Sequence, residues 1–115
     1  MDSILISVKK ILGIYEEDTS FDTDIIMHIN TVFMILRQMG IGPSKGYSIT
    51  GKYEYWSDYI KDLSLLESVK TYVALKVRLI FDPPASSTMV EAMNRTISEL
   101  EWRLNAQVDY PRSFE

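Results

Sequence analysis

The sequence predicts an all-α protein, folded as a small bundle of about four helices. In four stretches of the chain, apolar residues recur at intervals of three and four, which is the spacing of one face of a helix. Glycine, proline and capping residues stand between these stretches, where helices are expected to begin and end. The length of 115 residues suits one hydrophobic core. We therefore expect a single helical domain over residues 1–105, followed by a flexible C-terminal tail at 106–115, where no periodic pattern occurs.

The first two helices are predicted at residues 3–13 and 22–39. Ser3 offers a side-chain oxygen that can cap the first helix. An acidic link, residues 15–20, follows this helix. Asp22 is expected to cap the second helix, whose apolar seam repeats at intervals of four and three through Ile25, Ile29, Val32, Leu36 and Met39.

The last two helices are predicted at residues 64–82 and 87–105. Ser64 and Glu67 fit a capping box at the start of the third helix. This helix is apolar on most sides, so we expect it at the centre of the bundle. The fourth helix has a single apolar stripe, opposite a ladder of alternating charge that is expected to face solvent: Glu91, Arg95, Glu99 and Arg103.

A sharp corner is predicted between these two helices. Tandem prolines cannot donate the hydrogen bonds that continue a helix, and the residue before them is disfavoured in helical backbone. Ser87 and Thr88 can then cap the next helix, where Thr88 and Glu91 fit a capping box. The chain is therefore expected to reverse as a helical hairpin, with these structural corner residues: Asp82, Pro83, Pro84, Ser87 and Thr88.

Residues 41–62 are expected to form an irregular aromatic loop that is loosely held in the isolated chain. Glycines and one proline interrupt this segment, which also contains four tyrosines and one tryptophan. The alternation around Thr50 and Gly51 is compatible with a short β-hairpin, and the spacing of Trp56 and Tyr59 is compatible with a helical turn. The sequence leaves both alternatives open.

The sequence predicts no catalytic residue, no cofactor site and no metal site. The single histidine, His28, lies beside the apolar seam of the second helix, without a candidate nucleophile or co-ligand. The absence of cysteine excludes disulfides and thiol chemistry. Residues 42–46 lack the pattern of a phosphate-binding loop, and the acidic link lacks that of a calcium loop. No apolar run reaches the roughly 18 residues of a membrane span.

Aromatic residues away from the helical seams are candidate partner contacts, because Trp, Tyr and Arg contribute most of the energy of protein interfaces. Trp102 lies beside the charged face of the fourth helix, and it either packs under the loop or the first helix or contacts a partner. The loop aromatics have the same two alternatives, local packing or partner contact. The candidate protein-interface residues are Ile49, Tyr53, Tyr55, Trp56, Trp102, Tyr110 and Phe114.

Several short segments occur in a recognisable order: Ile49-Thr50-Gly51, Trp56-Ser57-Asp58, residues 72–84, Ser86-Ser87 and residues 99–105. Together they resemble the head–tail connector (adaptor) proteins of tailed bacteriophages, and the resemblance covers nearly the whole chain. It implies a helical structural protein, not an enzyme, that forms a ring of about twelve copies beneath the portal protein. The ring would extend the DNA conduit and dock the next neck or tail protein.

The resemblance also implies a location and a set of partners. The protein is expected in the virion, at the head–tail junction, after assembly in the cytoplasm of the bacterial host. DNA is expected to pass without sequence-specific binding, because the net charge of −4 opposes phosphate contacts, and no membrane or small-molecule substrate is expected. In isolation the chain is expected to be monomeric or weakly associated, with its loop and tail ordered only on the portal.

The main alternative is a small helical DNA-binding regulator. Such a protein needs a basic recognition face. In this sequence the basic residues are scattered over several elements, and the fourth helix alternates in charge.

Overall fold

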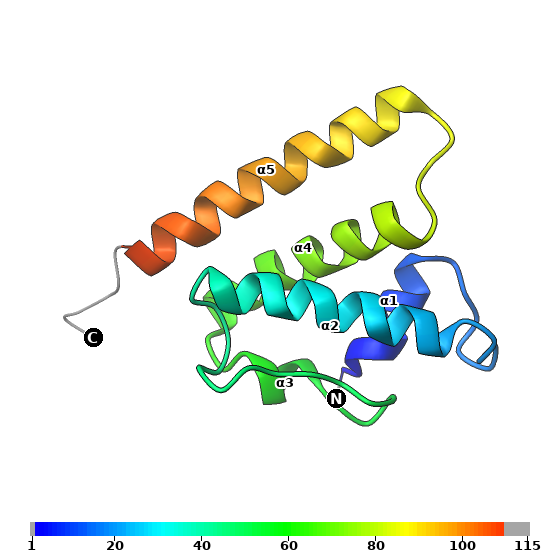
Figure 1. The fold of residues 1–115 in the computed structure, drawn as a ribbon, viewed down its shortest axis with the longest axis horizontal. Coiled ribbons are helices and arrows are strands. Elements are labelled where there is room, and N and C mark those ends of the chain that lie inside the picture. The colour runs from blue at the N-terminus through cyan, green and yellow to red at the C-terminus, as the bar shows by residue number, and fades with distance from the viewer. Residues whose placement is uncertain (1, 110–115) are drawn as a thin grey trace.

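The structure, a computed structural model, describes residues 2–109, which form five helices and no strand. In chain order these are α1 (Ile4–Ile11), α2 (Asp22–Gln38), α3 (Trp56–Tyr59), α4 (Leu63–Phe81) and α5 (Ser87–Asp109), as Figure 1 shows. The prediction of an all-α fold is confirmed. The four helices expected from periodicity correspond to α1, α2, α4 and α5.

The third predicted helix, α4, lies at the centre, as its apolar circumference indicates. It packs against α1, α2 and α5, and its inward residues Val69, Tyr72, Val73 and Val77 are buried. The helices α2 and α4 run antiparallel. Phe21, just before α2, lies edge-on to Phe81 at the end of α4, with ring centroids 5.5 Å apart. In Figure 1, α5 crosses on the opposite side of α4 from α1 and α2.

The start of α1 matches its prediction, whereas the start of α2 does not. Ser3 Oγ accepts a hydrogen bond from the amide of Ile6 at 3.3 Å, so the predicted cap is confirmed. Asp22 is the first residue of α2 rather than its cap, and the residue before it forms no side-chain capping bond. The predicted Asp22 cap is therefore wrong, because its carboxylate forms an ion pair with Lys9 instead.

The caps of α4 and α5 also stand earlier in the chain than predicted. Asp62 caps α4 by accepting a hydrogen bond from the amide of Ser64 at 2.9 Å. Ser86 Oγ accepts a hydrogen bond at 3.3 Å from an amide in the first turn of α5. An N-cap residue immediately precedes the first helical residue, and Asp62 and Ser86 occupy those positions. The predicted capping by Ser64, Ser87 and Thr88 is therefore wrong.

The chain reverses between α4 and α5, at the tandem prolines (Figure 1). Asp82 ends α4, and its carbonyl oxygen accepts a hydrogen bond from Arg78 Nε at 2.7 Å. The last helix continues to Asp109, beyond its predicted end at 105, so the first part of the expected tail is helical. Its final turn lies near the end of α2, where a Cβ on Gly40 would stand 3.1 Å from a methyl group of Val108.

Residues 41–62 contain no strand, so the β-hairpin alternative is wrong and the helical turn, α3, is confirmed. The turn at Thr50 and Gly51 is closed by a carboxylate. Glu54 accepts hydrogen bonds from the Thr50 amide at 2.8 Å, the Thr50 hydroxyl at 2.9 Å and the Gly51 amide at 3.3 Å. Tyr55 forms a single antiparallel bridge with Ser3, at the start of the chain.

This segment is anchored to the helices at several points. The Asn30 side chain on α2 donates to the Ile49 carbonyl at 3.0 Å and accepts from the Ile49 amide at 2.8 Å. Trp56 Nε1 donates to Ser7 Oγ on α1 at 2.8 Å. The Phe33 ring contacts Tyr59, with centroids 4.3 Å apart. The expectation of a loosely held loop is therefore wrong for Ile49, Trp56 and Tyr59, which have partners inside the subunit, whereas the ring of Tyr53 is exposed.

Candidate protein–protein interface

Two of the predicted interface residues lie inside the subunit. Ile49 is 1% exposed and Trp56 is 2% exposed, and both belong to the hydrophobic core. The Trp56 ring packs edge-on against Phe33, with centroids 6.3 Å apart. These residues have no surface to offer a partner in this conformation. We therefore correct their assignment: local packing, the alternative that the sequence left open, applies to both.

Two other predicted interface residues are on the surface. Tyr53 is 74% exposed at the tip of the turn after Gly51, where Lys52 Nζ lies 5.5 Å from its ring centroid. Trp102 is 71% exposed on α5, so packing under the loop or α1 is wrong for this residue. Tyr55 is half-buried beside the start of α1. Tyr110 and Phe114 lie outside the described residues.

The corner residues Asp82, Pro83, Ser87 and Thr88 are exposed, and Pro84 is half-buried. They therefore define the path of the chain from α4 to α5 without contributing to the core. Met89, in the first turn of α5, and Ile80, near the end of α4, expose apolar surface on either side of this corner.

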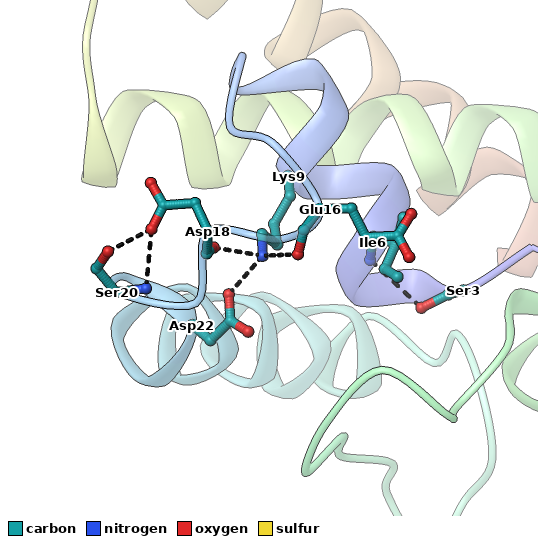
Figure 2. Close-up of polar contacts among 7 residues, drawn as sticks. All are labelled: Ser3, Ile6, Lys9, Glu16, Asp18, Ser20 and Asp22. Atoms are coloured by element: carbon teal, nitrogen blue, oxygen red, sulfur yellow. Dashed lines mark hydrogen bonds and ion pairs between the residues drawn. The ribbon is translucent and has the colours of Figure 1, made fainter.

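Sequence reasoning missed a buried lysine. Lys9 on α1 is 2% exposed, and its ammonium group is enclosed by the link between α1 and α2 (Figure 2). Nζ donates to the carbonyl oxygens of Glu16 at 3.1 Å and Asp18 at 2.7 Å, and it forms an ion pair with Asp22 Oδ1 at 2.8 Å. Two of the three N–H donors of the ammonium group are therefore bonded to main-chain oxygens, and the carboxylate of Asp22 balances its charge. We call this set of contacts the Lys9 clasp.

The clasp leaves the acidic side chains of the link on the outside. Figure 2 shows the Asp18 carbonyl facing Lys9 while its carboxylate turns away toward Ser20. Hydrogen bonds from the Ser20 hydroxyl and amide hold the pKa of the Asp18 carboxyl below its ordinary value. The sequence contains a signal for the clasp: Lys9 lies four residues after Leu5, on the apolar face of α1, where a lysine needs a partner.

Tyr15 was not among the interface residues predicted from the sequence. This residue of the link is 81% exposed, more than any other large hydrophobic side chain in residues 2–109. It follows Gly13, whose backbone is left-handed with φ of 78°, and it precedes the two carbonyl groups that Lys9 holds. The clasp therefore presents an aromatic side chain to solvent on a defined backbone.

Two tyrosines, Tyr59 and Tyr72, are buried, and burial changes the pKa of each. Burial raises the pKa of the Tyr59 phenol above its ordinary value. Burial also raises the pKa of the Tyr72 phenol, and its hydrogen bond to the negatively charged Glu101, at 2.7 Å, adds to the effect. The second contact links α4 to α5.

The surface has shallow hollows that differ in chemistry. One, of about 430 Å³, lies between α1, α2 and the turn at 50–53, and two of its ionisable groups, Lys9 and Asp22, are paired with each other. Another, of about 290 Å³, lies at the end of α2. Within residues 2–109, His, Cys, Asp and Glu form no cluster suited to a metal ion. The same part of the chain has no helix with the length and hydropathy of a membrane span.

A comparison with known families identifies the chain. A family model described as "Phage connector protein" matches residues 4–111, which include all five helices. The chain belongs to the phage connector protein family. The resemblance to connectors predicted from the sequence is thereby confirmed. Among curated proteins and among solved structures, no match to this phage connector protein was found.

Membership of this family suggests that the protein interacts with other phage head or tail proteins. For this connector protein, the candidate contacts are therefore the exposed aromatic residues on three separate elements. Tyr15 lies on the link, Tyr53 on the turn before α3, and Trp102 on α5.

Proposed function

We propose that this connector protein is a structural component of the virion that assembles as a ring of about twelve copies beneath the portal protein. The ring extends the DNA conduit and docks the next neck or tail protein at the head–tail junction. It acts through contacts alone, without catalysis or a cofactor.

The observation that carries the proposal is a complete core combined with aromatic residues on separate faces. Even the irregular segment 41–62 is packed within the subunit, so the exposed side chains of Tyr53 and Trp102 are not needed for its stability. A ring subunit needs several contact surfaces, because it touches two copies of itself and proteins above and below. Exposed Trp and Tyr residues are suited to such contacts.

The charge of the chain supports a conduit that does not bind DNA. The net charge is −4, which opposes contact with phosphates. Lys70 Nζ pairs with Asp2 at 2.6 Å, Arg103 pairs with Glu99 at 2.9 Å, and Lys9 is enclosed in its clasp. These pairings reduce the basic surface that a DNA-binding regulator requires, so the structure does not favour that alternative.

The test is to mix the purified protein with purified portal rings and to examine the mixture by negative-stain electron microscopy. We expect an additional ring of density beneath each portal. In parallel, filter binding to duplex DNA at low salt is expected to show no retention. Portals that remain unchanged, together with steeply salt-dependent DNA binding, would contradict the proposal and favour the regulator.

A further inference from the structure

Helix α2 separates two surfaces of unlike shape and charge. The link precedes this helix and the loop at 40–44 follows it, so the two surfaces lie about 25 Å apart, the length of α2 at about 1.5 Å per residue. One surface is acidic and protrudes. The other is concave and carries a cation.

We call residues 15–18 the acidic knob. It carries the exposed ring of Tyr15 together with Glu16, Glu17 and Asp18. The Lys9 clasp holds its backbone through the carbonyl oxygens of Glu16 and Asp18 (Figure 2). A surface segment that is fixed before binding loses little conformational entropy when a partner docks on it. The backbone of the knob is therefore ordered before a partner binds.

We call the concavity at the other end of α2 the basic hollow. It has a volume of about 290 Å³ and is lined by Arg37, Gln38, Gly40, Gly42, Pro43 and Ser44, a set with one cation and no carboxylate. Arg37 Nε donates to the Ser44 carbonyl at 3.0 Å, which orients the guanidinium group. Gly42 has φ of 87°, and a Cβ there would stand 2.6 Å from the Tyr59 ring, so this part of the lining is confined to glycine.

The two surfaces are complementary in size and charge. A cavity of about 150 Å³ accommodates benzene, so the hollow has room for a phenol ring. Lys45 is exposed beside the hollow and adds positive charge opposite the three carboxylates of the knob. A guanidinium group also stacks on aromatic rings and binds carboxylates, which are the two groups that the knob presents.

We propose that the acidic knob of one copy docks in the basic hollow of the next copy, with Tyr15 in the hollow and Glu17 against Arg37. The inference rests on the ring proposed above and names the surfaces that join its subunits. Because the two surfaces differ and lie at opposite ends of α2, the contact is heterologous and repeats head to tail, as a ring of about twelve copies requires.

A charge exchange tests this contact, because every copy carries both surfaces. The variants are Glu17→Arg, Arg37→Glu and the double variant, each mixed with portal and scored by electron microscopy for complete rings. Each single reversal is expected to lower the fraction of portals with a complete ring by about tenfold or more, since like charges then face each other. The double variant restores opposite charges and is expected to return to within about threefold of the wild type.

Two further variants separate the contact from folding. Tyr15→Ala removes an exposed ring and is expected to reduce ring formation without changing the thermal unfolding curve. Glu91→Arg, an equal charge reversal on the exposed start of α5, serves as the matched control and is expected to leave ring formation unchanged.

The outcomes distinguish this inference from the proposed function. If wild-type rings form on the portal and the single reversals have no effect, the knob-and-hollow contact is wrong while the proposed function stands. If the reversals reduce ring formation but the double variant does not recover, the two surfaces contact another protein, such as the portal, and not each other. If the wild type leaves the portal unchanged, the proposed function fails, and this inference fails with it.

Discussion

The irregular segment at 41–62 is more deeply buried than the helix α5, although a regular helix would be expected to be the better packed of the two. The segment has little regular structure, but Ile49, Trp56 and Tyr59 are buried, and α1 and α2 form hydrogen bonds with its backbone. The helix is the longest in the chain, but it packs mainly against α4 and exposes Met89 and Trp102.

The comparison shows that regular secondary structure and packing into the core are separate properties of a segment. A helix forms its hydrogen bonds within its own backbone, so it can be regular while most of its side chains face solvent. An irregular segment must find partners elsewhere for its backbone groups, as Ile49 does on Asn30. In this protein the irregular segment is part of the core, and the long helix provides surface.

The largest effect is expected from Trp56→Ala. This change removes a buried ring that packs against Phe33 and also removes the hydrogen bond to Ser7. The expected loss is about 3–5 kcal/mol of unfolding free energy, measured by chemical denaturation. If the segment were only a surface loop, the loss would be far smaller.

The matched control is Trp102→Ala on α5. Because this ring is largely exposed, the same substitution is expected to change the unfolding free energy by less than about 0.5 kcal/mol. The single-tryptophan variants Trp102→Phe and Trp56→Phe extend the comparison. Acrylamide is expected to quench the fluorescence of Trp102 strongly and that of Trp56 weakly, and equal quenching would contradict the contrast between the two regions.

A smaller effect is expected from Asn30→Ala, which removes the side chain that holds the segment to α2. The amide and carbonyl groups of Ile49 then lose their partners, at an expected cost of about 1–3 kcal/mol. Hydrogen exchange is expected to accelerate at the Ile49 amide. Thr31→Ala, the next residue on α2 and exposed, is the control and is expected to leave this exchange unchanged.

The smallest effect is expected from Tyr72→Phe, which removes the hydrogen bond between α4 and Glu101 on α5. The expected loss at neutral pH is about 1 kcal/mol. Because the pKa of Tyr72 is raised in the folded state, its contribution is complete below the unfolded-state pKa of about 10 and is lost as pH rises through the folded-state pKa. Above pH 10, the thermal stability of the variant is therefore expected to fall less steeply with pH than that of the wild type. Parallel slopes for the two proteins would show that Tyr72 does not contribute in this way.

The helices were predictable because their information is local. Apolar spacing located α1, α2, α4 and α5, and the tandem prolines located the reversal before α5. The caps were predicted less well, because Asp22 has a long-range partner in Lys9 that no local pattern reveals. The end of α5 was also missed, since its last turn lies against Gly40, far away in sequence.

The candidate interface residues were predictable only in part, for a related reason. Composition identifies aromatic residues as candidates, but it does not separate Trp56, which contacts Ser7 and Phe33, from Tyr53, which is exposed three residues earlier. Tyr15 was overlooked because its neighbours are charged, and the clasp beneath it depends on contacts with α1 and α2.

The Lys9 clasp holds the link mainly through main-chain oxygens, and every amino acid supplies such an oxygen. Substitutions at Glu16 or Asp18 therefore change the chemistry that the link displays without removing the carbonyl groups that maintain its shape. The side chains of this one loop can therefore vary while the backbone that carries them keeps its shape.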